Sequence, residues 1–337
     1  MAILSRVAEN LFWVGRYAER AMSVARLINA TAQLELDAGE ELEEDLWTPL
    51  VGLTRGQLPA QGRKRREASA GFRRYLAFDG SNPNSLSSCV SNARNAAREV
   101  RENLSSETWE QLNRLHLDSQ REELVAEAED RPHEFFRRTY ESLSLFQGLV
   151  DSTLARDETW NFLSLGTYLE RASNLARTVR LQSHLLVTIG EEDEAELARW
   201  TTVLRSCGSV EAYARYYSMR VDPPRVLEFL LLNPVFPQSL RYSLNAGWRA
   251  LVAVAGDPEA EQPGPAVRTL GRLRAQIDLA TIDEIVSAGF EPFLEGVSGQ
   301  VAETSDAITL AFFRKQPLPG PGAVARAAMI MASSQQQ

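Results

Sequence analysis

Two stretches of the chain carry the same charged residues at the same spacing. Residues 15–26, GRYAERAMSVAR, return 151 residues later as residues 166–177, GTYLERASNLAR, with seven of the twelve positions identical. Each copy holds a tyrosine, a glutamate and two arginines at matching positions. Self-similarity at a fixed spacing indicates an internal duplication, and it directs attention to the charges that both copies share.

The shared charges suit three kinds of chemistry. Surplus guanidinium groups can bind a carboxylate or phosphate through paired hydrogen bonds, with Tyr17 and Tyr168 supplying hydroxyls. Alternatively, the charges only form ion pairs that fix the register of packed helices, or Glu19 or Glu170 acts as a catalytic acid or base. The candidate ligand-binding residues, two of them from a later basic stripe, are Arg16, Tyr17, Glu19, Arg20, Arg26, Arg94, Arg98, Tyr168, Glu170, Arg171 and Arg177.

Metal and cofactor chemistry lack the residues that they need. A diiron bundle requires Glu-x-x-His pairs, and none of His116, His133 and His184 follows a glutamate by three residues. The sequence also lacks a phosphate-binding P-loop, a Gly-x-Ser-x-Gly nucleophile elbow and a dinucleotide fingerprint. Cys89 and Cys207 are too far apart in sequence to form a metal-type pair, and an apolar helix around Cys89 favours a small core residue. We therefore expect no metal and no cofactor.

The residues around each charged signature predict a long helix. Residues 3–36 contain no proline, and their apolar residues recur every three or four positions. Apolar residues also occupy the other sides of this helix, so its middle should be packed on nearly every side, with Glu19 and Arg26 inside the protein. A second long helix is expected at residues 157–189, and the packing of the two helices would gather two glutamates and four arginines in one central cluster.

Capping residues predict further helices. Ser85 is the expected N-cap of a helix running to about Asn103, Ser105 and Ser106 cap the next, and Pro132 fits the first turn of another. A final helix is expected at residues 292–314. A turn and the charged start of a helix should occupy the acidic residues 37–45. An exposed loop should occupy residues 55–66, and its basic run at residues 63–66 is solvated or docks an acidic partner.

These elements predict an all-α fold, a helical bundle of two tandem pseudo-symmetric repeats with long central helices. The Asn-Pro dipeptide at residues 82–83 recurs at residues 233–234, at the same 151-residue spacing, so the duplication covers most of the chain. We expect the first repeat at residues 1–155, the second at residues 156–315 packed on the first, and a flexible tail at residues 316–337.

The composition excludes several function classes. With 337 residues, of which 44% are hydrophobic, the chain can bury a sizeable core. Its 36 basic and 45 acidic residues give a formal net charge of -9, which opposes nucleic acid as a partner. Charges interrupt the first twenty residues as they would not in a signal peptide, and no later segment is apolar enough for a membrane span. We expect a cytoplasmic protein with no membrane or nucleic-acid partner.

Several motifs resemble one known family. The opening LSRVAENLFWVGRYAERA at residues 4–21, the NPNSL at residues 82–86 and the following ARNAAREVR at residues 93–101 closely resemble the bacterial alpha-E family, an all-helical group, over roughly residues 1–315. The family signature carries over as Glu19, Arg20 and Arg26, with Arg94, Arg98 and Arg101 on the later helix. This chain departs from the family at residues 95–97, where a more polar run is expected, and its loop at residues 55–66 is its own.

The resemblance also implies which proteins this chain works with. Members of the family are typically encoded beside a circularly permuted ATP-grasp protein, often with transglutaminase-like proteins nearby. It therefore implies a helical accessory or substrate-presenting component of a system that forms peptide or amide bonds, with an ATP-grasp ligase partner and a possible transglutaminase-like partner. The alternatives that stay open are an independent enzyme of peptide or amide chemistry using Glu19 or Glu170, and a purely structural scaffold. The basic stripe of Arg94, Arg98 and Arg101 faces the acidic signature or pairs with Glu99 and Glu102 on the surface.

Overall fold

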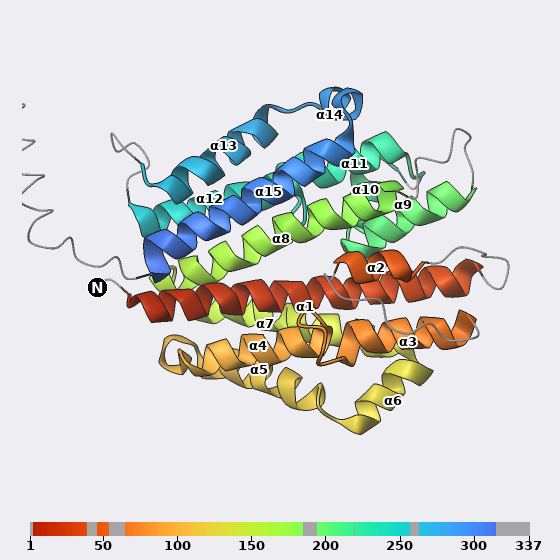
Figure 1. Cartoon of the computed structure of the whole chain (residues 1–337), viewed down its shortest axis with the longest axis horizontal. Coiled ribbons are helices and arrows are strands. Elements are labelled where there is room, and N and C mark those ends of the chain that lie inside the picture. The colour runs from red at the N-terminus through yellow and green to blue at the C-terminus, as the bar shows by residue number, and fades with distance from the viewer. Residues whose placement is uncertain are drawn as a thin grey trace, which may run out of the picture.

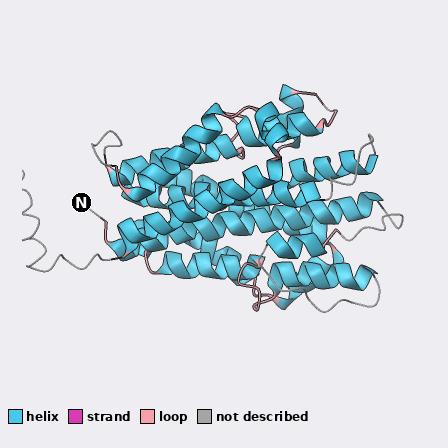
Figure 2. Cartoon of the chain, turned by 45° about the horizontal axis from the view of Figure 1, so that its top comes forward, coloured by secondary structure: helices cyan, strands magenta, loops and turns pink. Residues whose placement is uncertain are grey.

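The computed structural model describes residues 3–38, 46–53, 65–184, 194–218, 220–256 and 263–314. Within these ranges the chain is helical and contains no strand, which confirms the expected all-α class (Figure 2). The predicted acidic turn falls largely, and the predicted tail at residues 316–337 entirely, outside the described residues.

Two long helices run side by side through the middle of the molecule (Figure 1). They are α1 (Ser5–Ala38) and α8 (Glu158–His184), and they pack against each other more extensively than any other pair of helices. Both carry apolar residues around most of their circumference, as expected for a helix surrounded by other helices. The first charged signature, residues 15–26, lies within α1, and the second, residues 166–177, lies within α8.

Most of the remaining helices of the first half lie on the side of α1 that faces away from α8, but the first of them contacts α8 (Figure 1). In chain order they are α2 (Thr48–Leu53), α3 (Arg65–Phe78), α4 (Leu86–Arg98), the 3-10 turn η2 (Arg101–Asn103), α5 (Ser106–Asp118), α6 (Glu122–Asp130) and α7 (Pro132–Thr153). Helices α4 and α7 pack on α1, and α5 packs on both of them.

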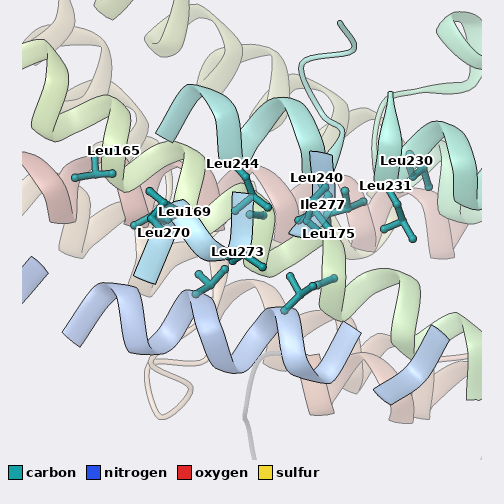
Figure 3. Close-up of a cluster of buried hydrophobic side chains, with 14 of the residues drawn as sticks. Leu165, Leu169, Leu175, Leu230, Leu231, Leu240, Leu244, Leu270, Leu273 and Ile277 are labelled. Atoms are coloured by element: carbon teal, nitrogen blue, oxygen red, sulfur yellow. The ribbon is translucent and has the colours of Figure 1, made fainter. Parts of the chain in front are cut away.

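The second half covers α8 in the same manner. Its helices are α9 (Glu194–Ser206), α10 (Val210–Tyr216), α11 (Pro223–Leu232), α12 (Leu240–Ala255), α13 (Pro265–Leu279), α14 (Ile282–Ala288) and α15 (Phe290–Ile308), followed by the π-helical turn η3 (Thr309–Phe313). Helices α12 and α15 pack on α8, and α13 packs on both of them. Figure 3 shows the leucine-rich core that α8, α12 and α13 share, including Leu169, Leu244 and Leu273.

The caps that the sequence predicts set where several helices begin. The Ser85 hydroxyl accepts a hydrogen bond from the Ser88 N–H at the start of α4, and Ser105 caps α5 in the same way. Pro132 stands in the first turn of α7, where its missing N–H has no intrahelical partner to lose. The final helix and its π-helical turn cover residues 290–313, close to the expected range.

Two boundaries differ from the sequence prediction. The expected loop at residues 55–66 is wrong for Arg65 and Arg66, which begin α3, while residues 55–64 lie outside the described residues. Ser69, Phe72 and Leu76 are buried on one stripe of this helix, and a polar residue in that stripe weakens the apolar signal in the sequence. The helix from Ser85 ends at Arg98 because the chain turns at Val100, which is fully buried.

The two central helices approach each other most closely where the signatures begin. A Cβ added at Gly15 would lie 2.1 Å from the carbonyl oxygen of Leu163, and one added at Gly166 would lie 2.0 Å from that of Phe12. Each glycine therefore faces the backbone of the opposite helix and makes room for it. This approach brings the charged residues that follow each glycine to one interface.

Candidate functional site

A fully buried glutamate lies at the centre of the interface between α1 and α8. The Glu170 side chain has 0% of its surface exposed and receives hydrogen bonds from three arginines. Arg16 donates from Nε at 2.6 Å, Arg20 donates from Nε at 2.7 Å and Nη2 at 3.0 Å, and Arg177 donates from Nη2 at 3.5 Å. Arg16 and Arg20 belong to α1, whereas Arg177 belongs to α8, as Glu170 does. Three guanidinium groups thus share one carboxylate.

The arginines decide the protonation state of this carboxyl. Burial alone would raise the pKa of Glu170, because a charged group loses hydration inside a protein. The positive charges of Arg16 and Arg20, the hydrogen bond from Arg20 and the charge of Arg177 outweigh burial and hold the pKa well below its usual range. In the same way, Glu170 outweighs burial at Arg20 and raises the pKa of its guanidinium. Glu170 and Arg20 are therefore both charged at neutral pH.

The second glutamate makes a tighter pair with a single arginine. Glu19, on α1, is 3% exposed and receives two parallel hydrogen bonds from Arg171. Arg171 Nε donates to Oε1 and Nη2 donates to Oε2, both at 2.8 Å. Gln147 of α7 donates a third hydrogen bond to the same carboxylate at 2.8 Å. A bidentate arginine pair combines charge with fixed geometry, so it orients α8 against α1.

In both interhelical pairs, the arginine also donates a hydrogen bond to a loop that begins with Asn-Pro. Arg20 Nη1 donates to the side-chain oxygen of Asn84, just before α4, and Arg171 Nη1 donates to the backbone carbonyl of Pro237 at 3.1 Å, just before α12. Each arginine thus connects the opposite central helix with the loop of its own half. The Asn-Pro repetition marked these loops in the sequence, but nothing in it indicated that they would contact the arginines.

The positive charges around Glu170 exceed the negative ones. Among the described residues, Arg16 and Arg20 carry two positive charges against this one carboxylate, which Arg177 also contacts, whereas Glu19 and Arg171 balance each other. The side chains of the three arginines keep 12%, 19% and 18% of their surface exposed, respectively. A dissolved anion can therefore contact these guanidinium groups, although the Glu170 carboxylate itself is fully buried.

A small cavity of about 30 Å³ adjoins this group. Polar residues from both central helices and from the loop before α4 line it, together with two apolar side chains. Its lining residues are Arg20, Ser23, Val24, Leu27, Asn84, Asn174, Arg177 and Thr178. Ser23 and Asn174 follow Glu19 and Glu170 by four residues, so the sequence already places them on the same helical stripes as these charges, whereas Gln147 and Thr178 carried no signal of their own.

Arg26 does not join the ion pairs although its sequence position matches that of Arg177. Its guanidinium lies over the Tyr140 ring, 5.9 Å from the centroid, and has no ion pair with any carboxylate of the described residues. It also approaches Gly208, where an added Cβ would lie 3.4 Å from Cζ. Burial lowers the pKa of Arg26 more than the charge of Glu19 raises it. The expectation that it lies inside the protein holds only in part, since it is half-buried.

The two signature tyrosines support the arginines through their rings. The Arg20 guanidinium lies 5.6 Å from the Tyr17 centroid, and that of Arg171 lies 5.2 Å from the Tyr168 centroid. Among the described residues neither phenol hydroxyl makes a hydrogen bond. Burial raises the pKa of both, so they are neutral hydroxyls at physiological pH. Their place is beside the arginines as cation–π partners.

The basic stripe on α4 lies apart from the cluster. Arg94 donates to Asn113 at 3.1 Å and lies over the Trp109 ring at 5.4 Å, so it faces α5. Arg98 is exposed and lies 3.8 Å from Glu99. Of the two alternatives left open by the sequence, these contacts correspond to the one in which the stripe does not face the acidic signature.

A larger cavity of about 310 Å³ lies elsewhere, among α3 to α7 of the first half. The sequence did not single out its lining, which combines apolar residues such as Phe78, Leu115 and Phe135 with a polar rim. Within the described part of the chain, no three His, Cys, Asp or Glu side chains are grouped as a metal site would need. The described helices also include none with the length and apolar character of a membrane span.

Comparison with known proteins places the chain in a family. Uncharacterized proteins of Mycobacterium bovis and Mycobacterium tuberculosis strain CDC 1551 are each 25% identical to it over 341 aligned residues, and one of strain H37Rv is 24% identical. The alignments cover 94% of this chain but 38% of each relative, so the chain spans well under half the length of these proteins. No solved structure matches it significantly.

The family model that matches residues 3–313 is Alpha-E, described as a predicted alpha-helical domain with a conserved ER motif. In this sequence the dipeptide Glu-Arg occurs twice, at residues 19–20 and 170–171, and both copies lie in the ion-pair cluster between α1 and α8. The fold, the matched length and the position of these dipeptides agree, and the chain belongs to the Alpha-E family.

Proposed function

We propose that this chain is a helical accessory or substrate-presenting component of an ATP-grasp-linked system that forms peptide or amide bonds, and that its Glu/Arg cluster binds a carboxylate or phosphate of the substrate. The observation that carries the binding role is the surplus of positive charge around Glu170 beside a small polar cavity.

The physical argument rests on the cost of concentrating like charges. Arg16, Arg20 and Arg177 converge on one carboxylate, and charges taken out of water must be paired or coordinate a ligand. Glu170 offsets one of the two positive charges of Arg16 and Arg20, so one remains where the protein has removed part of the water. A bound carboxylate or phosphate would offset it and accept bidentate hydrogen bonds from the guanidinium groups.

A partner protein is supported by the family and by the length of the relatives. The matched region is 38% of each mycobacterial relative, so in those proteins this domain is joined to further sequence. The resemblance to the alpha-E group associates the domain with ATP-grasp proteins and, at times, with transglutaminase-like ones. ATP-grasp ligases activate carboxylates, so a companion that holds a carboxylate-bearing substrate fits the same chemistry.

We also propose that the fold arose by duplication, with repeats at residues 1–155 and 156–315. Two features support this. The helices α1, α4, α5 and α7 pack in the same order as α8, α12, α13 and α15. In addition, Arg20 pairs with Glu170 while Arg171 pairs with Glu19, so matching residues of the two copies exchange partners across the interface.

The geometry gives less support to the acid–base alternative. A general acid or base works best with a pKa near the working pH, and the arginines hold that of Glu170 far below it. Both oxygens of Glu19 accept hydrogen bonds from Arg171, and one of them also from Gln147. A purely structural role would account for the balanced pair of Glu19 and Arg171 but leaves the surplus around Glu170 unexplained.

The proposal is tested with a candidate ATP-grasp partner. The full chain is co-expressed with that protein, the complex is isolated, and ATP consumption is measured with and without this chain. We expect a stable complex and a change in ATP turnover that depends on a carboxylate-bearing substrate. The absence of both a complex and any change in turnover would overturn the partner proposal.

A pair of arginine variants separates binding from folding in the same assay. Arg16→Ala removes one surplus charge while Arg20 still pairs with Glu170, and Arg98→Ala removes an exposed arginine outside the cluster as a matched control. We expect Arg16→Ala to keep its helical content and partner binding but to lose the effect on ATP turnover, and Arg98→Ala to behave as the unmodified chain. Equal behaviour of the two folded variants would argue against a ligand at the cluster.

A further inference from the structure

The lining of the cavity beside the cluster includes a buried hydrogen-bond donor that has no partner among the described residues. This donor is the side-chain amide nitrogen of Asn174 on α8. A buried N–H₂ group without a partner is costly, and in native proteins it commonly marks a place where a water or ligand binds.

The orientation of this amide is set by its neighbour. Arg177 donates from Nη2 at 2.6 Å to the side-chain oxygen of Asn174. Because a guanidinium group can only donate, the atom facing it must be the oxygen, and the nitrogen must face the other way. The amide therefore cannot be turned round to satisfy its nitrogen without breaking this contact.

Two hydroxyls contribute to the same lining. Ser23 of α1 and Thr178 of α8 both line the cavity, and neither makes a side-chain hydrogen bond within the described part of the chain. Serines and threonines in helices often donate to the carbonyl four residues earlier, as Thr167 and Thr202 do here. The hydroxyls of Ser23 and Thr178 are thus available as donors alongside the Asn174 amide.

The size of the cavity limits what these donors can bind. A volume of about 30 Å³ corresponds to roughly two water positions. The two oxygens of a carboxylate group occupy about that space and offer about four acceptor sites. A phosphate carries four oxygens around its phosphorus, so part of it would have to lie outside the cavity. Of the two anions that the arginines could bind, the cavity therefore fits a carboxylate better than a phosphate.

We propose that this cavity binds a single carboxylate group, not a phosphate, and that Asn174 donates the hydrogen bond that selects it. The inference rests on the proposed function and narrows its substrate class. Arg20 and Arg177 supply the positive charge, so a neutral amide of the same shape is bound less well. The rest of the substrate extends away from the cavity past the exposed parts of these two arginines.

The test uses the full chain and three probes at equal ionic strength in chloride buffer at pH 7: acetate, acetamide and inorganic phosphate. Binding is followed by titration calorimetry and by the side-chain amide resonances of Asn174, which need no variant to report on the site. We expect acetate to shift these resonances at lower concentration than phosphate and acetamide to leave them unchanged.

Three variants assign the effect to this residue. Asn174→Ala should weaken acetate binding by about tenfold, the loss expected for one hydrogen bond to a charged group. Asn174→Asp keeps the acceptor for Arg177, removes the donor and places a carboxylate in the cavity, so it should abolish the response to acetate. Asn113→Ala is the matched control, because Asn113 accepts a comparable hydrogen bond from Arg94 away from the cluster, and it should bind acetate like the unmodified chain.

The outcomes separate this inference from the proposed function. Phosphate binding that depends on Asn174 and exceeds acetate binding would overturn the carboxylate assignment but keep an anion site at the cluster. Acetate binding that is equal in Asn174→Ala and Asn113→Ala would place the carboxylate elsewhere and overturn the role of Asn174. No response to either anion would overturn both anion proposals, while the partner proposal still depends on the ATP-turnover assay.

Discussion

Replacing Gly15 with alanine should separate the two central helices. The new Cβ would lie 2.1 Å from the Leu163 carbonyl oxygen and 2.9 Å from the Thr167 backbone nitrogen, whereas ordinary contacts begin at 3.4 Å. The helices must therefore move apart by about 1.3 Å at this point. The obstacle is backbone, which cannot turn aside as a side chain does, and the movement also stretches the buried ion pairs that follow Gly15.

The expected cost follows from three contributions. Overpacking a close-packed site costs about 1–3 kcal/mol, and the backbone obstacle places Gly15 at the upper end. Alanine recovers about 1 kcal/mol because it favours the helix. Weakened buried ion pairs add to the loss, since breaking such a pair costs about 3–5 kcal/mol. We expect a decrease of about 3 kcal/mol or more in the free energy of unfolding, measured by urea denaturation with far-UV circular dichroism.

A matched control sets the reference for this experiment. Gly148 lies within α7, and nothing lies within 4 Å of a Cβ added there. Gly148→Ala should leave the stability unchanged or raise it by up to about 1 kcal/mol, because only the helix propensity changes. If Gly15→Ala unfolds at the same urea concentration as Gly148→Ala, the close approach of α1 and α8 at this glycine is refuted.

Three further predictions concern the buried groups. Glu170→Gln should lower the free energy of unfolding by about 3–5 kcal/mol, because it leaves the surrounding arginines without their carboxylate. The control Glu99→Gln changes an exposed glutamate and should lower it by less than about 1 kcal/mol. Urea denaturation of both variants measures the difference. The pKa of Glu170 is depressed in the folded state, so the contribution of this carboxylate to stability should be complete above pH 4.5, the ordinary pKa, and be lost as the pH falls below that value. Urea midpoints measured from pH 7 to pH 3 should therefore fall more steeply for the unmodified chain than for Glu170→Gln. Parallel curves would contradict the depressed pKa. Burial raises the pKa of Cys89 and that of Cys207 to about 12, so both thiols should react with a thiol reagent at pH 8 only after unfolding; rapid labelling of two thiols in the native protein would show that they are accessible.

The buried ion pairs and the surplus arginines have different consequences for this protein. The bidentate pair of Glu19 and Arg171 is balanced and sealed, so its effect is on how α1 and α8 are oriented. The group around Glu170 is unbalanced and borders a cavity, so it can respond to an anion. Variants of the first pair should therefore act mainly on folding, and variants of Arg16 mainly on binding.

The sequence by itself determined the helices and the set of charges that meet. Helical periodicity and capping are local properties, which is why the two long helices, the serine caps at residues 85 and 105 and the first-turn proline at residue 132 were predictable. The repeated signature also identified Glu19, Glu170, Arg20 and Arg171 as a group before any packing was known. Where a helix opens on a weakly apolar stretch, as α3 does, the same local signal was too faint.

Only the tertiary structure decided which charges pair and which do not. Arg26 and Arg177 occupy equivalent positions in the two signatures, yet Arg177 reaches Glu170 and Asn174 while Arg26 lies over Tyr140. A helical pattern shows that a residue lies on a given face, but the partner on that face depends on the crossing of helices far apart in sequence. The cavity and the unpartnered nitrogen of Asn174 arise from that crossing, because residues from α1, α8 and the loop before α4 meet there.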